Sequence, residues 1–158
     1  MQGILMAGGN GSRLNPITLA VSKQLLPIYD KPLTFYSLSV LFLAGIRSVT
    51  IVCMSRDLEA YTILFGDGRR FGAQITYVIQ DAPKGIAEGI LLCENYIKGC
   101  PLAMVLGDNF FWGQAFHEQL ATAKASVSTG AHIFGYRVGN PEDFGVLELD
   151  VNEQVISL

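Results

Sequence analysis

The sequence has 158 residues, of which 50% are hydrophobic and 16% are charged, which is enough for one compact domain with a sizeable core. Its 11 basic and 14 acidic side chains give a net charge of -3. This argues against a nonspecific nucleic-acid surface, which needs clustered lysine and arginine. The first residues lack the basic start of a signal peptide, and no apolar run reaches the ~20 residues that span a bilayer. We therefore expect a cytoplasmic protein that binds neither membranes nor nucleic acids.

Short apolar runs alternate with helical patterns along the chain. Runs of strand length that are apolar on both faces, as in parallel strands covered by helices, occur at 3–7, 49–53, 75–79 and 102–106. Apolar residues at helical spacing predict helices at 32–44, 58–65, 86–97 and 116–127. Further strands are expected at 133–138 and 146–149. This alternation predicts an α/β fold with a doubly wound, mostly parallel sheet in Rossmann-like three-layer packing, as a single domain over 1–158.

The cysteines and histidines do not suggest a metal site. Cys53, Cys93 and Cys100 are odd in number, have no CxxC spacing and lie in apolar stretches, which favours buried, reduced thiols over ligands or nucleophiles. His117 and His132 lie far from one another in the sequence, so a solvated or packed role is the simpler interpretation for both. Zinc binding is therefore not expected.

The loop after the first predicted strand is rich in glycine. Open sheets of this class bind ligands beyond the carboxyl ends of their strands, and here Gly8, Gly9 and Gly11 are followed by Arg13. Glycine lets backbone N–H groups approach a ligand without obstruction from a Cβ atom, and arginine offers a planar charged group to phosphate oxygens. The loop indicates a phosphate site, although a flexible turn with a surface arginine fits the same residues.

Two familiar glycine motifs do not match this loop. A dinucleotide fingerprint requires a third glycine where the sequence has Leu14, and a Walker loop requires Gly-Lys-Ser/Thr where Gly11 is followed by Ser12 and Arg13. Lys23 provides a second cation within reach of the same loop. The sequence therefore predicts a different kind of phosphate loop.

With Lys23 and its flanking residues, the sequence resembles the sugar-1-phosphate nucleotidyltransferases, and within them the thymidylyltransferases. The resemblance is carried by several motifs in the family's order, which read GILMAGGNGSRL, SKQLLPIYDKP, LAGIR, FGDG, VLGDN and FGVLELD. It implies transfer of a nucleotide from dTTP to a sugar 1-phosphate, with glucose 1-phosphate the first choice, giving dTDP-glucose and pyrophosphate. It also implies Mg²⁺ as cofactor and a homo-oligomer for the full-length family.

The same resemblance implies roles for residues of the first loop. Gly8, Gly9 and Gly11 would cradle the triphosphate. Arg13 and Lys23 would neutralise its phosphates and stabilise the charge that develops during the reaction.

Four residues farther along the chain also receive roles from the resemblance. Gln80 would hydrogen-bond the thymine edge, and Gly85 would let the backbone approach the base. Asp108 would bind Mg²⁺, a hard cation that prefers oxygen ligands, and Gly145 would lie near the sugar. Without the resemblance, Asp108 would be read as part of a turn and Gln80 as a solvated loop amide.

The sequence also departs from the family's pattern. Glu88, Gly89 and Phe144 stand where glutamine, alanine and tyrosine are common, and family chains continue beyond Leu158 to supply a sugar-phosphate lysine and a second metal-binding aspartate. The sequence therefore corresponds to the N-terminal half of the family, incomplete on the sugar-binding side. Two alternatives stay open: a short variant or fragment that binds nucleotide but is catalytically impaired, and a relative that uses another base or sugar.

Overall fold

The computed structural model describes residues 1–9, 11–82, 84–127, 130–152 and 154–157. The chain forms two compact units, Met1–Ser126 and Val127–Leu158, which we describe separately. No helix within the described residues has the length and apolar character needed to cross a bilayer.

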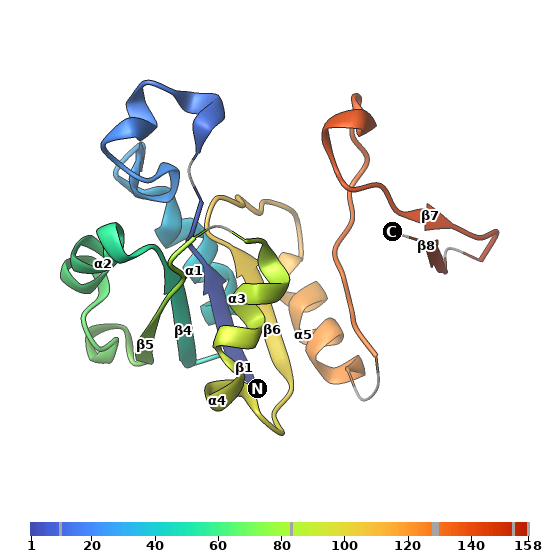
Figure 1. The fold of residues 1–158 in the computed structure, drawn as a ribbon. Coiled ribbons are helices and arrows are strands. Elements are labelled where there is room, and N and C mark those ends of the chain that lie inside the picture. The colour runs from blue at the N-terminus through green and yellow to red at the C-terminus, as the bar shows by residue number, and fades with distance from the viewer. Residues whose placement is uncertain (10, 83, 128–129, 153, 158) are drawn as a thin grey trace. The chain divides into compact units, whose positions relative to one another are not determined.

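A parallel sheet forms the centre of the first unit (Figure 1). Its strands are β1 (Gln2–Met6), β4 (Ser48–Cys53), β5 (Gln74–Ile79) and β6 (Leu102–Leu106), in the order β5-β4-β1-β6. All three strand pairs are parallel. The chain thus moves outward from β1 to β5 and then returns to the other side of β1. This reversal between β1 and β6 is the point at which sheets of this type bind ligands.

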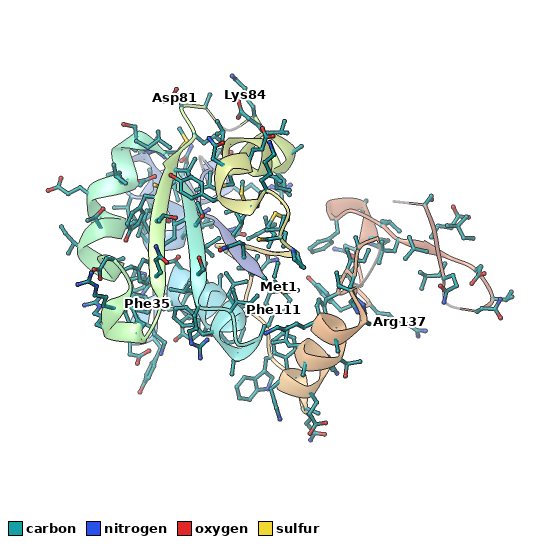
Figure 2. All side chains as sticks on the ribbon, turned by 90° about the horizontal axis from the view of Figure 1, so that it is seen from below. Met1, Phe35, Asp81, Lys84, Phe111 and Arg137 are labelled. Atoms are coloured by element: carbon teal, nitrogen blue, oxygen red, sulfur yellow. The ribbon has the colours of Figure 1, made fainter. Side chains whose placement is uncertain are left out.

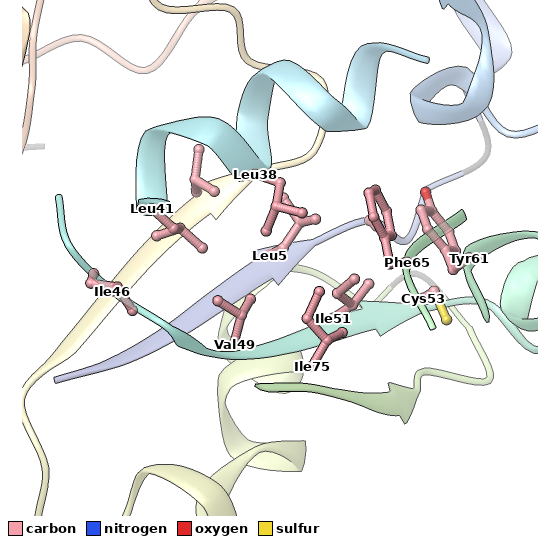
Figure 3. Close-up of a cluster of buried hydrophobic side chains, with 12 residues drawn as sticks. Leu5, Leu38, Leu41, Ile46, Val49, Ile51, Cys53, Tyr61, Phe65 and Ile75 are labelled. Carbon is pink, nitrogen blue, oxygen red and sulfur yellow. The ribbon is translucent and has the colours of Figure 1, made fainter. Parts of the chain in front are cut away.

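Helices cover both faces of this sheet, because successive strand side chains point to opposite faces. Leu5 packs into a cluster with residues of α1 (Leu33–Leu43) and α2 (Leu58–Phe65), as Figure 3 shows. Ile4 and Met6 pack on the other face with residues of α3 (Ile86–Leu92) and α4 (Glu94–Ile97). The predicted α/β fold with three layers is therefore confirmed.

The helix boundaries agree closely with the sequence patterns. Gly45 follows the end of α1 with a φ of 72°, a conformation that glycine adopts without the strain a Cβ atom causes. The helix expected at 86–97 is divided at Cys93 into α3 and α4. The remaining helix of this unit is α5 (Phe116–Ser126), whose Lys124 Nζ donates a hydrogen bond to the carbonyl of Ala44.

Shorter elements connect these helices and strands. In the first unit they are the two-stranded pair β2 (Pro27–Ile28) and β3 (Lys31–Pro32) and the 3-10 turns η1 (Ser12–Leu14), η2 (Ile17–Leu19), η3 (Lys23–Leu25), η4 (Ser55–Asp57) and η5 (Arg69–Phe71). The second unit contains η6 (Pro141–Asp143), β7 (Glu148–Leu149) and β8 (Val155–Ser157).

Two expectations for the second unit are wrong. Residues 133–138 form no strand, and the strand expected at 146–149 is reduced to β7, which pairs antiparallel with β8 instead of extending a parallel sheet. Tyr136 is 78% exposed. Alternating apolar residues suit a strand only where a neighbouring strand accepts the backbone hydrogen bonds, and the described part of this unit provides none to 133–138.

One of the three cysteines also differs from its prediction. Cys53 and Cys93 are buried, and burial raises the pKa of each thiol to about 11. Cys100 is exposed, because it lies in the turn between α4 and β6, where its N–H donates to the carbonyl of Ile97. Ile97 and Leu102, on either side of this turn, are partly buried against the core, whereas Cys100 between them is not.

Candidate functional site

A cavity of about 560 Å³ lies at the carboxyl ends of β1 and β6. Met6 and Leu106, which are the last register partners of these two strands, form part of its wall. It is therefore located where the strand order reverses. Eight residues that the sequence analysis selected line this cavity: Gly8, Gly9, Gly11, Arg13, Lys23, Gln80, Gly85 and Asp108. Gly145 belongs to the second unit, and its expected place near a sugar stays a prediction.

Gly11 holds the glycine-rich loop in its bent form. Its φ is 58°, and a Cβ atom there would lie 3.0 Å from Thr18 Cγ2 and 3.1 Å from Lys23 Cβ. The Thr18 hydroxyl donates to the Gly11 carbonyl at 2.8 Å. Both the backbone conformation and the available space therefore require glycine at this position. The turn η1, which carries Arg13, begins directly after it.

Lys23 and Asp108, which both line the cavity, form an ion pair. Lys23 Nζ lies 2.9 Å from Asp108 Oδ2, and the two side chains are 37% and 30% exposed. They meet because η3 follows the loop after β1, while Asp108 follows β6, the neighbour of β1 in the sheet. An ion pair this accessible adds little stability. A ligand with matching charges could replace it at low cost.

A buried hydrogen bond fixes the segment that carries Lys23. The hydroxyl of Ser22 donates to Asp57 Oδ2, and both residues are buried. Arg56 Nε lies 3.7 Å from the same carboxylate oxygen. The loop after β1 is thereby tied to η4, after β4. This contact could not be expected from the sequence, because its partners lie 35 positions apart and no local pattern connects them.

Gln80 enters the cavity wall from the end of β5. Its side chain is 2% exposed, and its Nε2 donates to Glu88 Oε2 at 2.7 Å and to the Gly85 carbonyl at 3.3 Å. Lys84 Nζ lies 3.3 Å from Glu88 Oε1. The hydrogen bond from Gln80, aided by Lys84, holds the pKa of the Glu88 carboxyl below its usual value. Gln80 therefore lies beside a carboxylate that stays ionised at neutral pH.

Gln24 is a site residue that was not expected from the sequence, and Gly107 lies close against it. Gln24 is 6% exposed, lines the cavity, and has an Oε1 that accepts no hydrogen bond from the described residues. A Cβ atom on Gly107 would lie 3.0 Å from the Met6 carbonyl and 3.1 Å from Gln24 Cγ. A buried acceptor without a donor is costly. A ligand that donates a hydrogen bond would satisfy Gln24, which lies in the SKQLLPIYDKP motif of the sequence.

Gly89 stands where the family's pattern has alanine, and the Met6 side chain accounts for the smaller residue. A Cβ atom on Gly89 would lie 2.2 Å from Met6 Cε and 2.8 Å from Met6 Sδ. The long Met6 side chain, which also lines the cavity, thus occupies space that a larger residue on α3 would need. The two positions are complementary in size.

The charges of the cavity suit a small polyanion. Arg13 and Lys23 contribute two cations to its lining, and Asp108 contributes one carboxylate. Among the residues that the structure describes, no three His, Cys, Asp or Glu side chains group together to hold a metal. A divalent cation here would need most of its ligands from a bound molecule.

Comparisons with known proteins identify the family to which this chain is similar. A family model described as nucleotidyl transferase matches residues 2–158. A glucose-1-phosphate thymidylyltransferase of Neisseria gonorrhoeae is 48% identical over 158 residues, which are 100% of this chain and 54% of that protein. A protein of the same name from Mycolicibacterium smegmatis is 44% identical over 158 residues, which are again 100% of this chain and 54% of that protein. The chain thus spans about half the length of the curated relatives it matches.

Two solved structures share the fold. One is a Bacillus anthracis protein named as a candidate glucose-1-phosphate thymidylyltransferase and crystallised with sucrose. It superposes with a TM-score of 0.90 at 32% identity, over 99% of this chain and 62% of that one. The other is a UDP-glucose pyrophosphorylase complexed with UDP-glucose. It has a TM-score of 0.61 at 27% identity, over 78% of this chain and 53% of that one.

Proposed function

The chain belongs to the nucleotidyl transferase family, and we propose that its cavity binds dTTP for transfer of the thymidylyl group to a sugar 1-phosphate. Glucose 1-phosphate is the sugar phosphate that the names of its relatives suggest. The products would be dTDP-glucose and pyrophosphate. The chain matches 54% of the length of those relatives. For this chain, the complete reaction and the identity of its sugar are therefore proposals.

The convergence of three features at one cavity carries the proposal. The glycine-rich loop leaves room for phosphate oxygens to approach the backbone, Arg13 and Lys23 supply positive charge, and Gln80 supplies a buried amide. A nucleoside triphosphate has the matching parts, namely a polyanionic chain and a base with hydrogen-bonding groups. The reversal of strand order between β1 and β6 is the usual place for such a ligand.

The proposed reaction requires charge neutralisation rather than a protein nucleophile. A phosphate oxygen of the sugar 1-phosphate would attack the α-phosphorus of dTTP, the bond between that phosphorus and the bridging oxygen would break, and pyrophosphate would leave with the electron pair. Both reactants are anions, so their repulsion contributes to the barrier. Arg13 and Lys23 would lower it by holding the phosphates and stabilising the charge of the leaving group.

Asp108 fits the Mg²⁺ that the resemblance implies. Its carboxylate is a hard oxygen ligand at the cavity, and it is only partly engaged, since Lys23 contacts Oδ2. Mg²⁺ commonly binds through one or two carboxylates together with substrate phosphates, which agrees with the single carboxylate of this lining. When bound, Mg²⁺ would neutralise phosphate charge beside Arg13 and Lys23.

The second candidate function is the same transfer from a nucleotide with another base. The likeness to a UDP-glucose pyrophosphorylase structure, at 27% identity, shows that this architecture also serves uridine nucleotides. Competition among dTTP, UTP and CTP for the cavity distinguishes the two. The cytoplasmic location expected from the sequence remains a proposal, as does the homo-oligomer that the resemblance implies for the full-length family, which light scattering of a full-length chain checks.

Release of pyrophosphate tests the proposed function. The chain is incubated with dTTP and glucose 1-phosphate in the presence of Mg²⁺, with reactions lacking the sugar phosphate as the control. Pyrophosphate formed only with both substrates, together with dTDP-glucose, supports the full reaction. Binding of dTTP without turnover supports the alternative of a catalytically impaired nucleotide-binding chain. Failure to bind dTTP overturns the proposal.

A further inference from the structure

The surroundings of the Gln80 amide determine which way it faces. An amide group can present either its oxygen or its nitrogen to a neighbour, and the choice follows from the partners. Here both close partners are acceptors, the Glu88 carboxylate at 2.7 Å and the Gly85 carbonyl at 3.3 Å. Only the NH₂ group can bond to them, and its two hydrogens are matched by these two acceptors.

The opposite orientation would place the Gln80 oxygen against two other oxygens. The ionised Glu88 carboxylate accepts hydrogen bonds and cannot donate one, and a hydrogen bond to a charged group is stronger than one between neutral groups. Lys84, which is labelled in Figure 2, lies in the loop before α3. Its ion pair with Glu88 helps to keep this carboxylate charged. The contact with Glu88 therefore opposes rotation of the amide.

This orientation leaves the Gln80 oxygen at the cavity wall. A Cβ atom on Gly8 would lie 3.0 Å from Gln80 Oε1, and both residues line the cavity. The hydrogen bonds that the described residues make with this side chain both leave from Nε2. What Gln80 offers to a ligand is thus an acceptor.

We propose that Glu88 is a positioning residue that holds the Gln80 oxygen toward the cavity and thereby makes the site prefer bases with an N–H at the contact point. This inference rests on the proposed function. Thymine and uracil carry a hydrogen on N3, whereas cytosine has a lone pair on the same atom. Facing the Gln80 oxygen, the first two form a hydrogen bond, and cytosine places two acceptors against each other.

The test compares the affinities of dTTP, dUTP and dCTP by calorimetric titration. The ratio of the dCTP to the dTTP dissociation constant is the measured quantity, because a change of charge near the triphosphate affects both nucleotides alike. In Glu88→Leu, which removes the acceptor, this ratio should fall about three- to tenfold, the range of one hydrogen bond. In wild type, dUTP should bind about as well as dTTP.

Two further variants separate the acceptor from the charge. Glu88→Gln loses the charge but keeps a carbonyl that can accept from Gln80, so it should retain most of the preference. Glu94→Leu removes an acidic side chain from the first turn of α4, away from Gln80, and should leave the ratio unchanged. Circular dichroism and dTTP affinity check that each variant folds.

The outcomes separate this inference from the proposed function. An equal fall in Glu88→Leu and Glu88→Gln would assign the hold on Gln80 to the charged form of the hydrogen bond, which supports the inference. A ratio that Glu88→Leu leaves unchanged overturns the role of Glu88, as does an equal fall in Glu88→Leu and in the control Glu94→Leu. In either case wild-type binding of dTTP would still support the proposed function. If wild type binds none of the three nucleotides, the proposed function fails first, and this inference fails with it.

Discussion

Lys23 and Asp108 lie 85 positions apart in the sequence, yet the Lys23 ammonium is 2.9 Å from the Asp108 carboxylate. Both residues line the cavity at the carboxyl ends of β1 and β6. Each residue is also the partner that a nucleotide with its cation would need, Lys23 for phosphate and Asp108 for Mg²⁺. The pair therefore resembles a resting arrangement in which each side chain satisfies the charge of the other.

This arrangement predicts that Mg²⁺ and nucleotide bind together. The chain should bind dTTP more tightly with Mg²⁺ than without it, and it should bind Mg²⁺ only weakly in the absence of nucleotide, since one carboxylate completes too little of its shell. Asp108→Asn should abolish the enhancement. Calorimetric titration of dTTP with and without Mg²⁺ measures this, and an equal enhancement in Asp108→Asn would exclude Asp108 as the ligand.

A substitution at Gly11 should cost more stability than the same substitution at a glycine without neighbours. Gly72 has a φ of 64° and open space around its Cβ direction, whereas a Cβ atom on Gly11 would meet Thr18 at 3.0 Å. Gly72→Ala should cost about 1 kcal/mol from the backbone alone. Gly11→Ala should cost about 2–4 kcal/mol, because crowding adds to the backbone term.

Urea unfolding of the two variants measures the difference. Equal losses would mean that the neighbours of Gly11 move aside easily, and that only its backbone conformation requires glycine.

Gly89→Ala should stabilise the protein by less than the roughly 1 kcal/mol that alanine gains over glycine in a helix. The added Cβ atom would meet Met6 Cε, the end of a flexible side chain that must then move, and this movement offsets part of the gain. A shorter side chain at position 6 should relieve the conflict. Met6→Leu combined with Gly89→Ala should therefore be more stable than the sum of the single changes predicts.

A double-mutant cycle from thermal or urea unfolding gives the coupling between these two positions. If Gly89→Ala alone gains the full helix-propensity difference of about 1 kcal/mol, the packing of Met6 against α3 is not as the structure shows it.

Ser22→Ala should weaken both the fold and the site. It leaves the buried Asp57 carboxylate without the hydroxyl that donates to it, a loss of about 1.5–3 kcal/mol for a hydrogen bond to a charged group. Because Lys23 follows directly, the affinity for dTTP should fall as well. Ser22→Thr keeps the hydroxyl and serves as the control. Unchanged stability of Ser22→Ala would show that water replaces the serine.

Much of the sheet and of the cavity could be predicted from sequence, for a physical reason. Apolar runs of strand length and helical spacing are local properties, and the loops after parallel strands necessarily meet at one edge. Gly11, Lys23 and Asp108 could therefore be expected to lie together. Gln24 could have been found in the same way, since it follows Lys23.

Contacts that depend on packing could not be predicted in this way. The hydrogen bond from Ser22 to Asp57 joins two different loops, and the fit of Met6 against Gly89 depends on the distance between a strand and a helix. The segment 133–138 has the alternation of a strand but no strand partner within the described part of its unit, which its own residues do not reveal. Local pattern places residues at an edge of the sheet, and tertiary packing decides which of them touch.

The position of bound nucleotide tests most directly whether the cavity is a nucleotide site. In a spectrum that resolves the backbone N–H groups, dTTP added with Mg²⁺ to the isotope-labelled chain should shift the signals of residues 8–9, 11–14, 80–82, 84–88 and 107–109. It should leave those of α2 and β5 nearly unchanged. Shifts of this kind, saturating with dTTP and absent with thymidine at the same concentration, are the predicted result. No saturable shift in these three loops, or shifts confined to another part of the chain, would contradict the assignment of the cavity as a nucleotide site.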